Sequence, residues 1–217
     1  MSSSGAMATD DWIEERPGDA RERSTVTSVE DAARAGFYGI LSTLLSAPPT
    51  QQVLDAIIRL KSEKQTPIGG AIAALAAAAR DADANDIADE FQDLFIGIGR
   101  GELLPYESYY LTGFLHEKPL ARLREHMEAL GISPDPDVRE PEDHIAAVLE
   151  IMSGLIDGTL GPGTPEEAAR FFDAHIESWV PLFLADLEAA EAARFYKFVG
   201  ALGTAFLRVE LDARGMA

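Results

Sequence analysis

The positions of apolar side chains along the chain predict a succession of helices. After Ser28, large apolar residues recur at the spacing that places them on one face of a helix. Ser28 and Asp31 resemble a capping box, which marks a helix start, and Pro48-Pro49 would interrupt the hydrogen bonds of a longer helix. A first helix is therefore expected between about residues 28 and 47. Its apolar residues are Phe37, Tyr38, Ile40, Leu41, Leu44 and Leu45.

The same spacing recurs downstream, each time between residues that start or stop helices. A second helix is expected after Thr50, and the alanine-rich stretch 71–80 predicts a third, because alanine has the highest helix propensity. The next helix covers 119–130 and ends at Gly131, which suits the residue after a helix end. Between them, one more apolar stripe consists of Ile87, Phe91, Leu94 and Phe95.

The last third of the chain predicts further helices. Pro141 suits the first turn of a helix that runs to about residue 156. The segment Thr164-Pro-Glu-Glu167 has the capping-box pattern with proline in the first helical position, and Pro181 is expected to kink or divide the helix that follows. The final helix is expected from about 189 to 212.

No segment shows the alternation of a strand, and no internal repeat is present, so the fold class is all-α. Helices of this number and length, broken by glycine and proline, predict a compact globular bundle of roughly eight to ten helices. We expect residues 1–27 to form a flexible acidic tail and residues 28–217 to form one helical domain. Within that domain, three prolines in 133–141 predict an extended connector.

The net negative charge of the chain indicates which classes of binding partner to expect. The 217 residues hold 18 Lys and Arg against 37 Asp and Glu, a formal net charge of −19. Binding to nucleic acid or to an anionic membrane surface needs a basic footprint, so both are excluded as expectations. A basic partner would be attracted. The charge is equally compatible with a role in solubility alone.

Cysteine is absent, so the chain holds no disulfide, thiolate nucleophile or Cys-ligated metal centre. The longest apolar run, 68–79, is too short to span a bilayer. The N-terminal residues lack the apolar core of a secretory signal. We therefore expect a cytoplasmic protein without stable membrane association.

Candidate chemistry is sparse, and no cofactor or metal is expected. The segment 97–101 lacks both nucleotide-binding glycine patterns and is best interpreted as a loop between helices. Glu140 and His144 could share a helix face, but a metal site needs more ligands. Asp143 suits the first turn of the helix predicted after Pro141, where a carboxylate satisfies free N–H groups.

The segment 105–110 combines three tyrosines with a glutamate. One interpretation is that Tyr106, Tyr109 and Tyr110 are core residues with their hydroxyls at the rim. The other is a binding groove, in which aromatic rings supply apolar contact and Glu107 or Asp143 pairs with a cation. Physical chemistry alone favours the core interpretation.

Four stretches together resemble a known family. They are 34–49, then Phe91-Gln-Asp-Leu-Phe-Ile-Gly97 with Leu104-Pro-Tyr-Glu-Ser-Tyr-Tyr110, then Glu140-Pro-Glu-Asp-His-Ile145, and finally 171–181. In their order and spacing they are similar to the TorD/DmsD/NarJ family of redox-enzyme maturation chaperones. The resemblance spans about residues 28–212. It departs from the family pattern at Tyr106, where many members carry tryptophan.

The resemblance implies an all-helical, TorD-like chaperone without catalytic activity. Its partner would be the apo catalytic subunit of a molybdopterin oxidoreductase, gripped by its twin-arginine signal peptide until the cofactor is inserted. Arginines of that peptide would meet Glu107, Glu142 or Asp143. The peptide-binding residues carried over from the family are Leu94, Phe95, Pro105, Tyr106, Ser108, Tyr109, Asp143 and His144.

Other functions stay open at this point. The chain could be an assembly factor of the NarJ type that serves a nitrate-reductase-like subunit without an exported signal. A nucleotide-dependent enzyme and a plain helical interaction domain are the alternatives of a different class. The oligomeric state is expected to be a monomer or a dimer that swaps domains at 133–141.

Overall fold

The computed structural model describes residues 28–63 and 65–215, and the elements of this part of the chain are helices joined by loops. It confirms the predicted all-α class, while the expected tail 1–27 lies outside the described residues. The elements are α1 (Val29–Ser46), α2 (Gln51–Ile58), α3 (Pro67–Asp81), α4 (Ala84–Phe91), η1 (Gln92–Ile96, a π-helical turn), α5 (Glu107–Thr112), α6 (Lys118–Ala129), α7 (Ile145–Asp157), α8 (Pro165–His175), α9 (Val180–Ala189) and α10 (Tyr196–Gly215).

Hydroxyl side chains fix the starts of several helices where the sequence predicts them. Each accepts a hydrogen bond from a backbone N–H in the first turn that has no partner within the helix. Ser28 caps α1 through the N–H of Asp31 at 3.0 Å, and Thr164 caps α8 through the N–H of Glu167 at 3.3 Å. Thr50 begins α2 in the same way. These starts are local, so they could be predicted from neighbouring residues.

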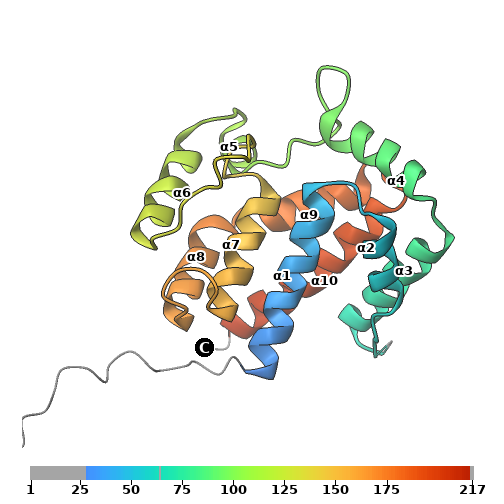
Figure 1. The fold of residues 1–217 in the computed structure, drawn as a ribbon, viewed down its shortest axis with the longest axis horizontal. Helices are drawn as coiled ribbons and strands as arrows, with labels where there is room; N and C mark the ends of the chain where they lie inside the picture. The colour runs from blue at the N-terminus through green and yellow to red at the C-terminus, as the bar shows by residue number, and fades with distance from the viewer. Residues whose placement is uncertain (1–27, 64, 216–217) are drawn as a thin grey trace, which may run out of the picture.

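Helices α1 and α7 form the central pair of the bundle. Figure 1 shows α1 beside α7 in the middle of the molecule, with α10 crossing behind them. Helix α10 packs against α9 and α3, α2 packs against α3, and α8 packs against α7. Helices α5 and α6 contact each other and lie together at one end of the molecule. Within the described residues, no helix is long and apolar enough to cross a membrane.

The division expected at Pro181 is confirmed, because the helix that starts after Thr164 is split into α8 and α9 and Pro181 lies in the first turn of α9. Two predicted boundaries differ from the structure. Helix α7 begins at Ile145 rather than at Pro141. Helix α10 begins at Tyr196 rather than near residue 189.

A buried carboxylate explains the late start of α10. The side chain of Glu90, on α4, is 2% exposed and accepts hydrogen bonds from the backbone N–H groups of Arg194, Phe195 and Tyr196 at 2.7–3.0 Å. A carboxylate placed at free N–H groups stabilises a helix N-terminus. The break between α9 and α10 is thus fixed by a residue more than one hundred positions away.

A tight turn after η1 delivers the next segment back to the helical body. Gly97 has φ of 61°, and a Cβ there would lie 2.1 Å from the carbonyl oxygen of Arg100, so only glycine fits. Beyond the turn, the N–H of Leu103 donates to the carbonyl of Leu94 at 2.8 Å. The glycines of 97–101 therefore have a structural role in the loop that leads to Pro105.

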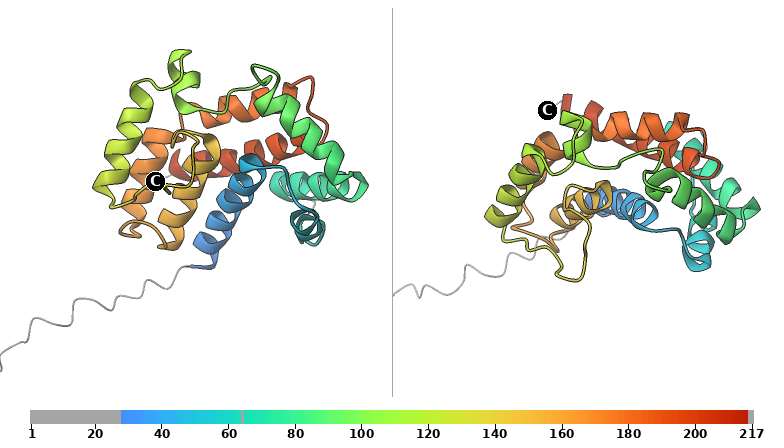
Figure 2. Two further views of the ribbon diagram at one scale, coloured as in Figure 1. Left: turned by 45° about the horizontal axis from the view of Figure 1, so that its top comes forward. Right: turned by 90° about the horizontal axis from the view of Figure 1, so that it is seen from above.

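The proline-rich connector between α6 and α7 forms an exposed arch. We call residues 133–140 the strap. All of them are exposed, and in Figure 2 this yellow segment bulges away from the helices. One hydrogen bond, from the N–H of Ile132 to the carbonyl of Met127 at 2.8 Å, fixes the point where the strap leaves α6. The strap therefore meets solvent on one face and the helical body on the other.

Candidate functional site

Two segments that the sequence singles out separately lie side by side. The N–H of Glu107 donates to the carbonyl of Asp143 at 3.0 Å, and the N–H of Ile145 donates to the carbonyl of Pro105 at 2.8 Å. These bonds pair Tyr106 with His144 in an antiparallel bridge. The Pro-Tyr-Glu-Ser segment and the Asp-His segment therefore form one structural unit.

Asp143 caps a helix, but not its own. Its side chain is 1% exposed, and Oδ2 accepts a hydrogen bond at 2.9 Å from the N–H of Ser108, in the first turn of α5. The prediction that Asp143 sits in the first turn of α7 is wrong, because residues 141–143 form a turn closed by the N–H of His144 on the carbonyl of Pro141 at 3.0 Å. Within the described part of the chain, Asp143 Oδ1 and Ser108 Oγ are buried without a hydrogen-bond partner.

Glu107 is enclosed on the far side of the same helix. Its side chain is fully buried, and Oε2 lies 3.1 Å from Nδ1 of His175, whose Nε2 lies 3.1 Å from Nδ1 of His126. Burial raises the pKa of Glu107, and the hydrogen bond to His175 offsets part of that rise. Protein encloses both Glu107 and Asp143, the two carboxylates expected to pair with a cation of a ligand, so neither faces the surface in this structure.

His144 begins α7. Its Nδ1 accepts a hydrogen bond from the N–H of Ala146 at 3.2 Å, so this nitrogen is unprotonated and the proton of the neutral ring is on Nε2. Burial lowers the pKa of His144, against the opposing effect of the Glu140 and Asp143 carboxylates. The ring of Tyr106 lies edge-on to the imidazole with 5.2 Å between centroids.

Tyr106 ties this unit to the strap. Its hydroxyl donates to Oε2 of Glu140, at the end of the strap, over 2.5 Å. Burial and the neighbouring Glu140 carboxylate raise the pKa of Tyr106, so the phenol stays protonated as a donor at neutral pH. No other side-chain hydrogen bond from the described helices to residues 133–140 is present.

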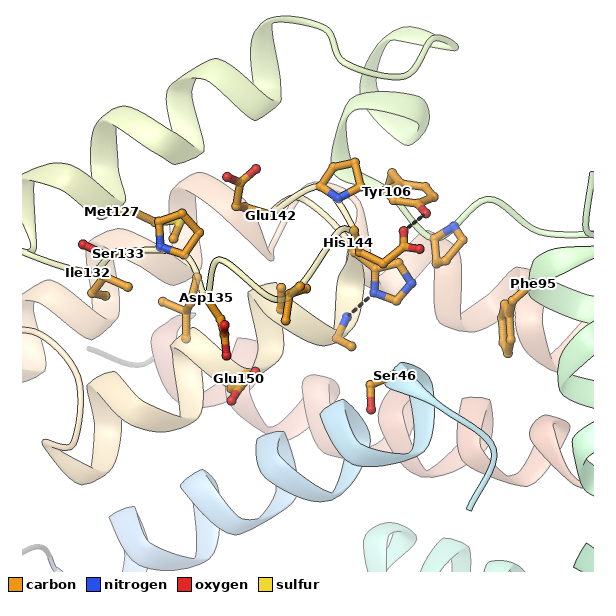
Figure 3. A pocket seen from close by; sticks show the side chains of 18 of the residues that line it. Ser46, Phe95, Tyr106, Met127, Ile132, Ser133, Asp135, Glu142, His144 and Glu150 are labelled. Carbon is orange, nitrogen blue, oxygen red and sulfur yellow. Dashed lines mark hydrogen bonds between the residues drawn. The ribbon is translucent and has the colours of Figure 1, made fainter. Parts of the chain in front are cut away.

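A pocket of about 510 Å³ opens between the strap and the helices. Figure 3 shows His144 and Tyr106 at its centre, Phe95 on one side, and Asp135 and Glu150 on the other. Phe95 is held by edge-to-face packing on Phe91 and Tyr196, with centroids 4.9 and 5.4 Å apart. The apolar lining comes mainly from Phe91, Phe95, Ile96, Pro105, Met127, Ile132, Val138, Ala147, Ile151 and Leu160.

The charged residues of the pocket have one sign. Asp135, Glu140, Glu142 and Glu150 line it, and no lysine or arginine is among the described lining residues. A basic side chain, Arg124 of α6, reaches Glu142 at the rim with Nε and Nη2 at 2.9 and 2.7 Å from Oε2. An apolar cavity edged with carboxylates suits a ligand that joins a cationic group to an apolar body.

Comparisons with known proteins identify the family of the chain. The family model for the nitrate reductase delta subunit matches residues 61–185. The chaperone protein TorD of Aliivibrio fischeri is 30% identical over 82% of this chain and 93% of its own length, and that of Vibrio atlanticus is 28% identical over 85% and 95%. The chain belongs to the TorD/NarJ family of redox-enzyme maturation chaperones. The matched stretch of this TorD/NarJ-family chain contains both paired segments and the strap.

A solved structure supports the same fold for the TorD/NarJ-family chain. A protein from Archaeoglobus fulgidus, described as a redox enzyme maturation protein, superposes with a TM-score of 0.56 over 87% of this chain and 99% of its own. Its sequence identity is 22%, so the likeness shows the fold alone. The two relatives named above carry the name of chaperones rather than of enzymes.

The structure separates the site residues expected from the TorD/NarJ resemblance into two groups. Phe95, Pro105, Tyr106, Glu142 and His144 line the pocket. The others lie behind it or beside it: Leu94 is fully buried in the core, Glu107, Ser108 and Asp143 are enclosed, and Tyr109 accepts a hydrogen bond from Arg100 at 2.6 Å outside the pocket.

Sequence reasoning missed the wall that the strap contributes. Asp135, Val138 and Glu140 come from it, and Glu150 and Ile151 come from α7. The prolines marked this segment as extended, which is correct, but they gave no sign that it lies over a pocket. Among residues 28–63 and 65–215, no three His, Asp or Glu side chains are grouped as a metal ion would need.

Proposed function

We propose that this chaperone binds the arginine-bearing leader of the catalytic subunit of a molybdopterin oxidoreductase in the pocket beneath the strap. Binding would hold the apo subunit in the cytoplasm until its cofactor is inserted and assembly is complete. The observation that carries the proposal is an apolar pocket of about 510 Å³ edged by Asp135, Glu140, Glu142 and Glu150.

The chemistry of a twin-arginine leader matches this pocket in two respects. Its apolar stretch would lie against Phe95, Val138 and Ile151, in the manner of an amphipathic segment in a groove. Its guanidinium groups would pair with carboxylates at the edge, with the geometry that arginine forms on a carboxylate. The pocket volume is within the range of small-ligand sites, so it fits a few side chains rather than a folded domain.

The polar groups of the pocket support binding rather than catalysis. His144 uses Nδ1 to cap α7, and Glu140 accepts from the Tyr106 hydroxyl. A general base must be free to accept a proton from a substrate. Both groups instead hold the shape of the pocket, which is consistent with relatives named as chaperones.

A substitution that fills the pocket tests this function. Ala147 lines the pocket on α7 and is only partly buried, so Ala147→Phe places a ring in the cavity without disturbing the core. The probe is a synthetic peptide with an Arg-Arg pair followed by an apolar stretch, and affinity is measured by calorimetry. We expect Ala147→Phe to weaken binding about tenfold or more, since it removes the space the peptide would use.

The matched control is Ala174→Phe, at an exposed position of α8 outside the pocket. It adds the same ring and should bind the peptide as the unmodified chain does. Raising the ionic strength should weaken binding in both, because charged groups at the pocket edge are screened. Equal affinity of the two variants would show that the peptide does not occupy this pocket.

A second client class is favoured by the family model, which describes the nitrate reductase delta subunit and covers residues 61–185. In that case the chaperone would serve a nitrate-reductase-like subunit that has no exported leader. A peptide with Gln-Gln in place of Arg-Arg distinguishes the two. Loss of affinity favours the twin-arginine leader, and unchanged affinity favours recognition of apolar client sequence.

A further inference from the structure

One carboxylate of the pocket already holds a guanidinium group. Arg124 of α6 places Nε and Nη2 at 2.9 and 2.7 Å from a single oxygen, Oε2, of Glu142. Glu142 lines the main pocket and also a smaller hollow between α6 and the strap, which Arg124 lines from its other side. In Figure 3 the Glu142 carboxylate points away from Asp135 and Glu150. The ion pair therefore holds Glu142 turned outward at the rim.

We infer that Arg124 occupies, in the free chaperone, the guanidinium position at Glu142 that an arginine of the leader takes on binding. This inference rests on the function proposed above and assigns Glu142 as the arginine-selective position of the pocket. Arg124 is then an internal competitor for that position. The leader arginine displaces it, and the smaller hollow between α6 and the strap is opened to the ligand.

The geometry makes the exchange feasible. The side chain of Arg124 is 57% exposed, so it can turn into water without leaving a buried contact behind. The side chain of Glu142 is 16% exposed, so this carboxylate needs a cationic partner more than Arg124 does. Ion pairs that are largely exposed contribute little to stability, and a ligand held by additional apolar contacts can replace one partner.

The charge state of Glu142 is suited to this role. Burial alone would raise its pKa, but the hydrogen bond and positive charge of Arg124 outweigh burial, and the pKa lies below its ordinary value. Glu142 is therefore ionised near neutral pH and can hold either the guanidinium of Arg124 or the one that replaces it. A lysine ammonium would bind less well, because it is a point charge and cannot offer two coplanar N–H groups to one oxygen.

Removing the internal competitor tests the inference. In Arg124→Gln, the affinity for the Arg-Arg peptide should rise about two- to fivefold, the gain available from an exposed ion pair. Arg122→Gln is the control, since Arg122 is an exposed residue of the same helix, outside both pockets, and its loss changes the net charge equally. Affinity for a Lys-Lys version of the peptide should rise no more in Arg124→Gln than in Arg122→Gln.

A second pair of variants locates the effect at Glu142. Glu142→Gln should remove the preference for the Arg-Arg over the Lys-Lys peptide, and the double variant Arg124→Gln/Glu142→Gln should bind no tighter than Glu142→Gln alone. A gain that persists without Glu142 would overturn the inference. So would equal affinities of Arg124→Gln and Arg122→Gln.

The outcomes separate this inference from the proposed function. If Ala147→Phe abolishes peptide binding while Arg124→Gln and Arg122→Gln remain equal, the leader binds in the pocket but Arg124 does not compete with it. If the unmodified chain binds neither peptide, the proposed function fails and the inference fails with it.

Discussion

The hydrogen bond from Ser108 to Asp143 gives a sharp prediction about what the Asp-His segment does. Asp143→Ala removes the acceptor at the start of α5 and leaves the buried N–H of Ser108 without a partner. Lost helix caps cost about 0.5–2 kcal/mol. Because Asp143 is 1% exposed, water cannot readily replace it, and we expect a loss near the upper end, about 2 kcal/mol.

The loss can be measured by urea unfolding followed by circular dichroism. For a chain of this size, about 2 kcal/mol corresponds to a fall in Tm of roughly 4–8 °C. Asp143→Asn is the matched variant, since its amide oxygen can still accept from the Ser108 N–H and asparagine caps about as well as aspartate. We expect its unfolding free energy to stay within about 1 kcal/mol of the unmodified chain.

Binding provides the result that decides between a positioning role and direct contact. Asp143 does not line the pocket, so Asp143→Asn should bind the Arg-Arg peptide within about twofold of the unmodified chain. If Asp143 instead met a leader arginine, neutralising it would cost about tenfold or more in affinity with little change in stability. That pattern would refute the reasoning from burial.

Two further predictions concern the residues around the strap. Tyr106→Phe removes the hydrogen bond to Glu140 and keeps the ring against His144. Amide hydrogen exchange in 133–140 should therefore accelerate, while the free energy of unfolding changes by no more than about 1.5 kcal/mol. Unchanged exchange would show that this hydrogen bond does not hold the strap. His144→Asn keeps a capping acceptor for Ala146 but does not titrate. Because folding lowers the pKa of His144, its contribution to stability is complete above about pH 6.5 and is lost as the pH falls through the lowered value. Between pH 7.5 and pH 5, the free energy of unfolding measured in urea should therefore fall more in the unmodified chain than in His144→Asn. Equal falls in the two chains would contradict this role of His144.

The helix starts show which part of the fold a sequence can predict. Ser28, Thr50 and Thr164 act on N–H groups three residues away, so the cause and its effect lie in one short window. The alanine-rich α3 is predicted because propensity sums over its own residues. The all-helical class follows from such local signals, and the structure confirms it.

Boundaries set by distant residues could not be predicted in this way. Glu90 fixes the start of α10, and Asp143 caps α5 rather than the helix that follows it in sequence. Both are carboxylates at helix N-termini, so the type of interaction was predictable and its partner was not. An acidic residue before a helix has the same sequence pattern whether it caps that helix or one brought to it by the fold.

The candidate site shows the same division. The resemblance named residues from two segments, and the structure pairs those segments through two backbone hydrogen bonds. Half of the named residues lie behind or beside the pocket rather than in its lining. A sequence motif contains residues that hold the shape of a structural unit as well as residues that face a cavity. Glu107 and Asp143 are enclosed and hold the shape of the unit, whereas Tyr106 and His144 do so and also line the pocket.

The position of the strap distinguishes a few acidic residues from the rest. Most of the 37 acidic residues lie on open surface, where salt screens them and water solvates them. Asp135 and Glu140 instead belong to the strap, which lies over an apolar cavity, and Glu150 on α7 lines the same cavity. With a low-dielectric wall behind them, these carboxylates attract a cation more strongly than the same groups on an exposed helix would. Under the proposed function, recognition of a basic leader would depend on the carboxylates placed around this pocket, including Glu142 at its rim, and the total charge of −19 would mainly speed the encounter.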